Sequence, residues 1–440
     1  MKRIRKSRKK KIIKAFLFLM LIIGLFIVFN KIIFNNRKDN EVNIDIIIDE
    51  IISKIKNEDI DKGFLMWISN NYGKDNLINL NSNLDKNGYT LDIWHDITGN
   101  SYIVLKDLYL NKYDNMTNIK ILDNKKENTI SFVGDVSLAD NWYIMPAYDE
   151  RKKGIYGILS EEIVKIMNDS DVMVVNNEFT ISNRGEKMPN KYYTFRASPK
   201  RLSIYSEMGV DLLTLANNHV YDFGRTAFYD MIDSLNEYNI PYIGAGKNIE
   251  EAMRPYYFIV GGYKFAFINA TRAEKYILTP EATETEGGVF RCYDPSNLIN
   301  MIKSTKANAD YVITLIHWGK ENSHDLEEVQ KTTSKMYIDA GTDIIVGTHA
   351  HVLQGIEFYK NKPIIYNLGD FIFNEETKET GIFQVKLNEN NLEYYFIPAL
   401  EKNEYTSLLK NEEKERVIKN LNSWSINAIV DNNGQIKSTN

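Results

Sequence analysis

The sequence predicts an α/β protein whose strands pair largely in parallel, preceded by one transmembrane helix. Two observations support this prediction. From about Asn128 onward, apolar runs typical of buried strands alternate with helical patterns, as they do in domains built on parallel sheets. Near the N-terminus, the run from Ala15 to Phe29 is apolar throughout except for Gly24. The chain therefore divides into an N-terminal segment for the membrane and a folded body.

Residues 1–34 are predicted to form a basic cytoplasmic tail and a signal anchor. Residues 2–11 contain eight basic side chains and no acidic one, and Lys14 adds a ninth. The apolar run that follows approaches the ~20 residues that a spanning helix needs, and the basic flank places the N-terminus in the cytoplasm. A cleaved signal peptide is the alternative, but no small-residue cleavage motif follows the run. We therefore expect a single-pass membrane protein with residues 35–440 outside the cell.

Charge and cysteine content exclude several classes of protein. The formal net charge is −5, and without the nine basic residues of the N-terminal flank it falls to about −14. An acidic body argues against nucleic acid as a partner, and against binding an anionic polymer by bulk charge alone. The single cysteine, Cys292, excludes an internal disulfide framework and a cysteine-rich zinc site.

Residues 35–127 are predicted to be an extracytoplasmic spacer or small subdomain. Apolar residues in 42–55 follow the spacing of an amphipathic helix. Residues 90–94 and 102–104 flank a Gly-Asn pair, which favours a hairpin. His95 lies between them without a metal-like partner, so we expect a surface histidine. This region offers no chemistry.

The main domain is predicted to span residues 128–402, and residues 403–440 a C-terminal helix and tail. Runs typical of strands occupy 129–135, 171–178, 211–219, 263–269, 311–317, 344–351 and 363–370. Residues 383–387 and 392–396 predict a hairpin at the edge of a sheet. Residues 411–424 predict a helix, and the tail after Asp431 is expected to fray.

Polar side chains with metal-binding atoms follow the ends of these strands. They are Asp135, Glu178, Asn218, His219, His317, His349 and His351. Carboxylate, amide oxygen and imidazole are ligands of divalent cations, and the carboxyl ends of parallel strands meet at one edge of a sheet. Each residue alone also has an ordinary interpretation, as a turn or loop acid, a helix N-cap or a structural histidine. Because four of the six histidines lie at such ends, we predict a metal site.

The order of these motifs resembles the bacterial CapA (PgsA) family, which is tied to capsule and poly-γ-glutamate synthesis. The motifs are Gly-Asp (134–135), Asn-x-Glu (176–178), Asn-Asn-His-x-x-Asp-x-Gly (217–224), His-Trp-Gly-x-Glu (317–321), Gly-x-His-x-His-x-x-Gln (347–354) and Tyr-x-Leu-Gly-Asp-Phe (366–371). The resemblance covers about Asn128 to Leu400. It implies the calcineurin-like metallophosphoesterase fold, a two-sheet sandwich flanked by helices with a dinuclear site at the sheet edge.

The resemblance also implies a role for each residue. The first metal would be bound by Asp135 and His351, the second by Asn218, His317 and His349, with Glu178 as the bridging ligand. The site would hold one or two divalent metal ions, and the metal would be Mn, Zn or Fe.

The catalytic group implied by the resemblance is His219, which would contact the substrate oxyanion or protonate the leaving group. Asp222, one helical turn further on, would orient its imidazole, and Glu321 would serve His317 in the same way.

Three positions depart from the superfamily pattern. Ser137 stands where the first motif has histidine, and Glu178 where the second has aspartate; both changes weaken the first metal site. Asp370 stands where the family commonly has asparagine, and is either a replacement ligand or a turn acid. Arg196 is a candidate for binding a substrate carboxylate or phosphate, with a surface salt bridge as the alternative.

Three functions are compatible with this sequence. The first is a membrane-anchored accessory protein of anionic polymer synthesis or export, working with the cell membrane and with membrane subunits of a capsule-polymer synthase. The second is a metal-dependent phosphoesterase acting on a phosphate ester of the cell envelope. The third is a surface binding module that uses an inherited site only as a pocket. Retention of His219 and Asp222 favours chemistry, whereas the histidine missing at Ser137 favours the binding module.

Overall fold

In a computed structural model of the protein, the structure describes residues 43–440 except 58, 124, 126, 275–277 and 389–390. The chain forms two compact units, divided between Ile93 and Trp94. Among the described residues, no helix combines the length and the apolar character needed to cross a membrane. The predicted basic tail and signal anchor, residues 1–34, lie outside the described residues.

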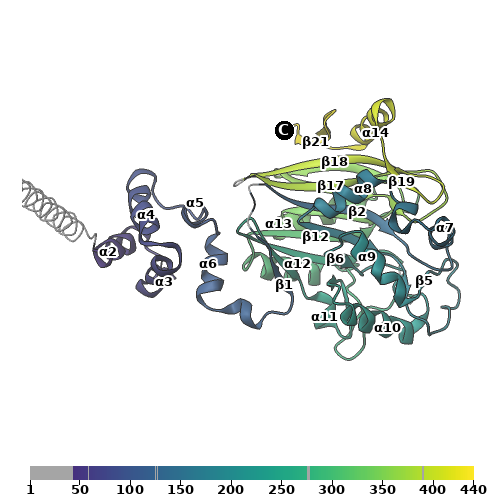
Figure 1. The fold of residues 1–440 in the computed structure, drawn as a ribbon, viewed down its shortest axis with the longest axis horizontal. Coiled ribbons are helices and arrows are strands. Elements are labelled where there is room, and N and C mark those ends of the chain that lie inside the picture. The colour runs from purple at the N-terminus through teal and green to yellow at the C-terminus, as the bar shows by residue number, and fades with distance from the viewer. Residues whose placement is uncertain (1–42, 58, 124, 126, 275–277, 389–390) are drawn as a thin grey trace, which may run out of the picture. The chain divides into compact units, whose positions relative to one another are not determined.

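The described part of the first unit is helical. It contains α2 (Ile44–Ile55), α3 (Lys62–Tyr72) and α4 (Lys74–Asn87), each of which contacts the other two (Figure 1). The amphipathic helix predicted over 42–55 is confirmed as α2. The side chains that these helices bury include Ile48, Ile51, Phe64, Leu65, Ile68, Leu77 and Leu80.

The second unit contains a larger and a smaller mixed sheet. In order across the larger sheet lie β20 (Ala428–Val430), β21 (Gln435–Ser438), β18 (Asn391–Glu401), β17 (Lys378–Asn388), β2 (Glu127–Val136), β3 (Val172–Asn177), β6 (Leu212–Thr214) and β7 (Tyr242–Ile243). Two further strands lie beside this row: β16 (Asp370–Ile372) pairs with β2, and β19 (Thr406–Leu408) pairs with β18. The strands β2, β3, β6 and β7 are parallel, as the sequence predicts.

The smaller sheet contains the strands that the sequence predicts for the middle of the domain. Its order is β1 (Ile119–Ile121), β9 (Tyr256–Val260), β10 (Tyr263–Thr271), β12 (Tyr311–Trp318), β13 (Ile344–His349), β15 (Lys362–Leu368) and β14 (Leu353–Tyr359). The pairs β10–β12, β12–β13 and β13–β15 are parallel. Short ladders outside the two sheets join β4 (Thr180–Ile181) to β5 (Arg196–Ala197) and β8 (Ala245–Gly246) to β11 (Gly288–Val289).

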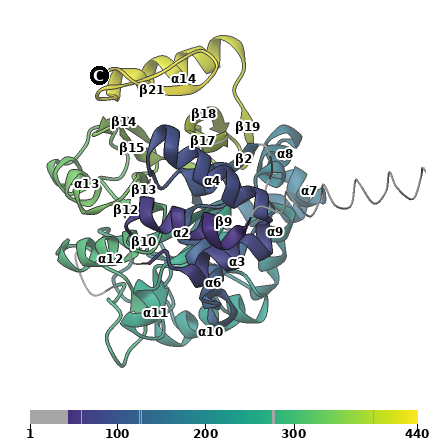
Figure 2. The ribbon, with the colours of Figure 1, turned by 90° about the vertical axis from the view of Figure 1, so that its left-hand side faces the viewer.

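The two sheets pack face to face, and helices cover their outer faces. Side chains of both sheets, such as Phe132 and Phe267, form the core between them. On the larger sheet lie α8 (Glu161–Asp169), α9 (Ser203–Glu207) and α10 (Gly224–Glu237); on the smaller sheet lie α12 (Ser296–Lys306) and α13 (Glu328–Ala340). Figure 2 shows α12 and α13 on one side of the sheets and α8 and α9 on the other. The predicted two-sheet arrangement flanked by helices is therefore confirmed. Two further helices of this unit are α7 (Ile144–Arg151) and α11 (Ile249–Met253).

The hairpin predicted around residues 99–100 is wrong. The chain forms two short helices there, α5 (Ile93–Thr98) and α6 (Tyr102–Tyr109). Ser101 is the N-cap of α6, and its Oγ accepts a hydrogen bond from Val104 N at 3.3 Å. A serine cap followed by apolar residues on one helical face outweighs the β propensity of the same residues.

Residues 94–127 belong to the second unit, not to the separate spacer that we expected for 35–127. Strand β1 pairs in parallel with β9. Asp107 on α6 forms a buried ion pair with Lys264 on β10, Oδ2 to Nζ, at 2.7 Å. His95 is half-buried rather than on the surface, because its Nε2 lies 2.9 Å from Gly261 O and its ring stacks on Tyr263 at 4.3 Å.

The C-terminal residues complete the larger sheet. The predicted helix is confirmed as α14 (Asn411–Trp424), and the predicted hairpin as β17 and β18. This hairpin does not lie at the edge of the sheet, since β19 and β21 both pair with β18. The frayed tail that we expected after Asp431 is also wrong, because β21 forms there and pairs with β20 and β18.

Candidate metal centre

Polar side chains from both sheets meet at the carboxyl ends of the central strands. From the larger sheet and the loops after its strands come Asp135, Glu178, Asn218, His219 and Asp370; from the smaller sheet come His317, His349 and His351. Since β2, β3 and β6 run parallel, as do β12 and β13, the residues that follow these strands lie at the same edge of the sandwich. All eight side chains are buried or nearly so.

Glu178 lies at the centre of this group. Its Oε1 is 3.4 Å from His317 Nε2 and 4.0 Å from both His219 Nε2 and His351 Nε2, yet it has no hydrogen-bond partner. Burial, followed by the charge of Asp135, raises the pKa of Glu178 well above its ordinary value of 4.5. A buried carboxylate oxygen that faces imidazole nitrogens and receives no hydrogen bond fits a divalent cation, which would neutralise it.

Three overlapping sets of ligand atoms occur among the described residues, each with its atoms within 4.8 Å of one another. They are Glu178 with His349 and His351, Asp135 with His351 and Asp370, and Asp135 with Glu178 and His317. In addition, the buried Nδ1 of His349 has no hydrogen-bond partner. Asp135 and Glu178 each belong to two of these sets, and a carboxylate shared in this way can bind two neighbouring cations. These residues therefore fit one or two divalent ions.

Burial and neighbouring carboxylates together determine the protonation of His317, His349 and His351. Burial lowers the pKa of His317 well below 6.5 and that of His349 to about 3, so both imidazoles are neutral, the form that binds metals. Burial also disfavours the charged form of His351. The charge of Asp370, together with hydrogen bonds to Asp135 and Asp370, outweighs burial and raises the pKa of His351 well above 6.5. A cation at this position would take the place of that proton.

Asp370 is a buried strand residue, not a turn acid. Its Oδ1 is 2.7 Å from His351 Nδ1, and its Oδ2 accepts a hydrogen bond from Asn374 Nδ2 at 3.1 Å. A carboxylate on one nitrogen of a histidine orients the ring and leaves the other nitrogen available. Accordingly, His351 Nε2 is directed towards Glu178.

Asn176 holds the two central carboxylates, a role that we did not predict. Its Nδ2 donates to Asp135 Oδ1 at 2.8 Å and to Glu178 Oε2 at 3.2 Å. Its Oδ1 accepts hydrogen bonds from Thr214 Oγ1 and Asn217 Nδ2, at 3.1 and 3.2 Å. The signal was present in the sequence, because residues two apart in a strand point to the same face, and Asn176 precedes Glu178 by two.

The backbone that carries two of the histidines is strained. His349 has φ of 97° and His351 of 56°, values that residues with a side chain adopt at a cost of ~1–3 kcal/mol. His349 N donates to Asp135 Oδ2 at 3.0 Å, which helps to hold this conformation. Just before it, a Cβ on Gly347 would meet Tyr366 O at 1.9 Å. Strain of this kind persists where the surrounding structure fixes a functional geometry.

The predicted pair of His219 and Asp222 is brought together. Nδ1 of His219 is 2.8 Å from Asp222 Oδ2, which also accepts a hydrogen bond from Phe195 N at 2.7 Å. This contact leaves His219 Nε2 on the side of the ring that faces Glu178, at 4.0 Å from its Oε1. The geometry therefore presents Nε2 to the ligand cluster.

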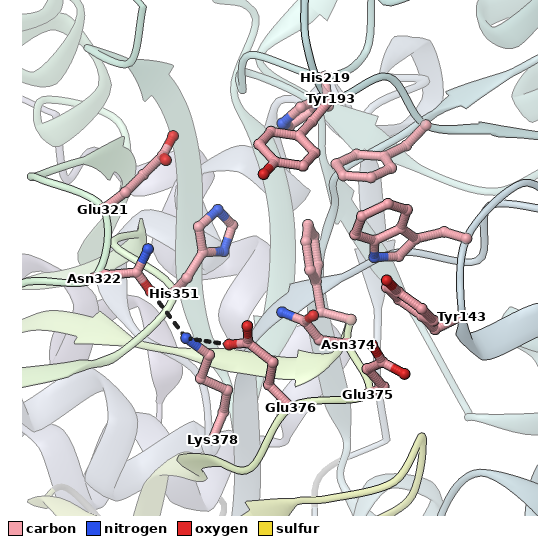
Figure 3. Close-up of a pocket in the computed structure, with 13 residues that line it drawn as sticks. Tyr143, Tyr193, His219, Glu321, Asn322, His351, Asn374, Glu375, Glu376 and Lys378 are labelled. Carbon is pink, nitrogen blue, oxygen red and sulfur yellow. Dashed lines mark hydrogen bonds and ion pairs between the residues drawn. The ribbon is translucent and has the colours of Figure 1, made fainter.

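A cavity of about 270 Å³ opens above the cluster, and Figure 3 shows the residues that line it. His219 and His351 face this cavity. One wall is aromatic and comprises Trp142, Tyr143, Tyr193, Phe195 and Phe373. The remaining lining residues are polar: Glu321, Asn322, Asn374, Glu375, Glu376 and Lys378. Ions at the cluster would thus be reached from a half-aromatic pocket.

Two predicted residues lie elsewhere. The Arg196 guanidinium stacks on Phe223 at 4.1 Å and lines a different surface hollow, so it does not face the ligand cluster. Glu321 is exposed at the rim of the cavity. The nitrogens of His317 have other partners, Thr348 Oγ1 at 2.9 Å and Asn218 Oδ1 at 2.7 Å.

We expect unequal affinities for two cations, because Ser137 stands where the family resemblance implies a histidine ligand. Its Oγ is buried without a hydrogen-bond partner, and a hydroxyl is a poorer metal ligand than imidazole. After dialysis, elemental analysis of the full-length protein should find one ion retained and a second largely lost. Ser137→His should retain the second ion as well. Ser53→His adds a histidine to the exposed face of α2, which belongs to the first unit, and should change nothing. Two equally tight ions in the unmodified protein would contradict the expectation.

Comparisons with known proteins point to one family. A family model described as "Bacterial capsule synthesis protein PGA_cap" matches residues 129–375. The "Capsule biosynthesis protein CapA" of Bacillus anthracis is 28% identical over 300 residues, which cover 66% of this chain and 70% of that protein. The "PGA biosynthesis protein CapA" of Bacillus subtilis (strain 168) is 29% identical over 284 residues, or 63% and 72% of the two chains.

Solved structures show weaker similarity. A 5'-nucleotidase from Candida albicans SC5314 aligns with a TM-score of 0.33 and 13% identity, over 62% of this chain and 53% of that one. The protein TT1561 of Thermus thermophilus aligns with a TM-score of 0.32 and 12% identity, over 61% of this chain and 98% of that one. TM-scores this low do not establish a common fold.

Proposed function

Because this chain belongs to the bacterial capsule synthesis protein family PGA_cap, we propose that it supports synthesis or export of an anionic capsule polymer such as poly-γ-glutamate, and that it does so through a divalent-metal site. The family and the names of the two Bacillus relatives support the first part. One observation carries the second: the unpaired Oε1 of Glu178, with three imidazole nitrogens within 4.0 Å of it.

The setting that we propose is the outer face of the bacterial cell membrane. The basic residues and apolar run of 1–34 would anchor the protein there. Membrane subunits of a polymer synthase are the expected partners. The acidic character of the body argues that a polyanion is engaged at a defined site, not over the whole surface.

A second candidate function is hydrolysis of a phosphate ester of the cell envelope, and the pairing of His219 with Asp222 favours it. A pure binding module has no need of a proton donor beside the ligand cluster. The cations, when bound, would polarise the phosphoryl group. In the overall reaction a water oxygen bonds to phosphorus, and the bond to the leaving oxygen breaks with its electron pair.

The residues of the chain would then supply the proton that the leaving oxygen needs. Asp222 Oδ2 accepts a hydrogen bond from His219 Nδ1, which fixes the orientation of the ring. His219 gives the Nε2 proton to the leaving oxygen and regains a proton from the attacking water. Asp370 orients His351, and Asn176 Nδ2 donates hydrogen bonds to both Asp135 and Glu178.

The test combines enzyme assay and genetics. We expect purified full-length protein, loaded with Mn²⁺ or Zn²⁺, to hydrolyse aryl phosphates, and to lose that activity with EDTA. In a strain of Bacillus subtilis that lacks its own CapA, the wild-type chain should restore polymer production, whereas a His317→Ala chain should not. Arg196→Ala, outside the cavity, is the matched control. Restoration by His317→Ala, with no hydrolysis by the wild type, would leave the binding module as the function.

A further inference from the structure

Lys191 is a buried cation next to the proposed proton donor. Only 3% of its side chain is exposed. Its Nζ lies 2.8 Å from Asp222 Oδ1 and 3.3 Å from Glu274 Oε2, and it donates a hydrogen bond to Asn218 O. A lysine is buried this deeply only where other groups compensate its charge and its three N–H donors, and these partners do so.

The ammonium group completes the surroundings of Asp222. The carboxylate is fully buried, and its Oδ2 serves His219 Nδ1 and Phe195 N. Its Oδ1 has no aligned hydrogen bond, and the charge of Lys191 at 2.8 Å is the compensation that the structure gives it. Loss of that charge would leave a buried anion uncompensated, and such a group moves towards other donors or water.

Lys191 also holds the residue on the other side of His219. The carbonyl oxygen of Asn218 accepts hydrogen bonds from Lys191 Nζ and, at 2.8 Å, from Thr279 Oγ1. The side chain of Asn218 places its Oδ1 2.7 Å from His317 Nε2, within the ligand cluster. The Lys191 ammonium group therefore contacts both the carbonyl oxygen of Asn218 and the carboxylate of Asp222. His219 lies between these two residues in the sequence, in the same turn.

The segment that carries Lys191 also forms the wall of the cavity. Tyr193 and Phe195 line it, and the Phe195 ring is 4.5 Å from the His219 ring. Phe195 N in turn donates to Asp222. The position of this wall relative to His219 thus depends on the same carboxylate that Lys191 compensates.

We propose that Lys191 is a positioning residue, which holds Asp222 and the Asn218 carbonyl so that His219 presents Nε2 to the leaving oxygen of a phosphate ester. This inference rests on the proposed hydrolysis for its chemical consequence. Its geometric part, the orientation of the His219 ring, stands without it.

The first experiment compares leaving groups. A phenyl phosphate needs a proton on its leaving oxygen, whereas a 2,4-dinitrophenyl phosphate does not. Lys191→Met should therefore lower kcat on phenyl phosphate by about 10- to 100-fold, as loss of an orienting partner does, and should change kcat on the dinitrophenyl ester little. Lys191→Arg should recover most of the loss. Lys187→Met, exposed on the same segment, should behave as wild type. Metal content is measured in each variant, so that rates are compared at equal occupancy.

The second experiment needs no activity. In full-length protein labelled with ¹⁵N-histidine, the six histidines give few imidazole signals, and the one lost in His219→Gln identifies His219. We expect a slowly exchanging Nδ1–H signal in the wild type, its loss in Lys191→Met and Asp222→Asn, and its retention in Lys191→Arg. Lys191→Gln serves if the methionine variant does not fold.

The outcomes separate the two claims. An unchanged His219 signal in the neutral variants would overturn the inference. Equal slowing of both esters would also overturn it, because general damage to the site has that effect. A wild type that hydrolyses neither ester, but whose His219 signal is lost in Lys191→Met, would refute the proposed hydrolysis and leave the positioning role standing.

Discussion

Replacement of Glu178 by glutamine should lower the affinity of the protein for divalent cations by on the order of a hundred-fold or more, while the protein stays folded. Glu178 Oε1 faces the Nε2 atoms of His317, His219 and His351, at 3.4, 4.0 and 4.0 Å. An amide of the same shape has no negative charge for a cation. Titration calorimetry with Mn²⁺ and Zn²⁺ on the full-length protein measures the change. Glu321→Gln, which removes an exposed acid at the cavity rim, should leave the affinity unchanged.

Although Glu178→Gln should bind metal more weakly, its metal-free form should not be less stable than the metal-free wild type. In the metal-free protein, burial and the charge of Asp135 raise the pKa of Glu178 above its unfolded value of 4.5. The protonated Glu178 carboxyl therefore contributes its full stabilisation of the folded state below pH 4.5. This stabilisation is lost as the pH rises through the pKa that Glu178 has in the folded protein. Thermal unfolding at neutral pH in EDTA should therefore find Glu178→Gln at least as stable as wild type. Metal added at a concentration between the two dissociation constants should raise the Tm of the wild type only. An equal rise in both proteins would exclude Glu178 as a ligand.

Replacement of His219 by glutamine should lower kcat/KM on phenyl phosphate by about 10²–10⁴-fold, the usual contribution of a general acid. The bound metal should be retained, because Asp135, Glu178, Asn218, His317 and His349 are unchanged. The reason lies in the contact of His219 Nδ1 with Asp222 Oδ2 at 2.8 Å, which directs Nε2 to the cluster. Glutamine has no comparable proton to give. The measurement is steady-state kinetics together with elemental analysis of the same samples.

A matched control for this variant is available in the chain. His324 stacks on Trp424 at 4.0 Å, away from the cavity lining. His324→Gln should retain the wild-type rate. If His219→Gln also retained it, the proton would have to come from another donor, and the role implied by the family resemblance would not apply to this chain.

The candidate site could largely be predicted from the sequence because its signals are local. Polar residues directly after apolar strands, such as Glu178 and His317, can be recognised without knowledge of the tertiary structure. Lys191 could not be recognised in this way. Its partners Asp222 and Glu274 lie 31 and 83 residues further along the chain, and nothing next to it marks a buried ammonium. Burial of a charge is a property of the folded structure.

The fold was less predictable where local and tertiary preferences conflict. Residues 102–104 have high β propensity, yet the cap at Ser101 and the pairing of Asp107 with Lys264 make them helical. The assignment of residues 94–127 to the second unit was equally hidden, because the three-residue strand β1 acquires its place only from β9. Short elements of this kind carry too few residues to produce a periodic pattern.

The candidate ligand atoms come from both sheets, and this has a consequence for the amount of protein that a cell maintains. Asp135 and Glu178 belong to one layer of the sandwich, and His317 and His349 to the other. A cation among them would bind only when the two layers are docked, so that its binding free energy adds to the stability of the native state. Scarcity of the metal would therefore enlarge the unfolded fraction that proteases remove. Cells short of the ion would lose the protein itself, and not only the metal-dependent function that we propose.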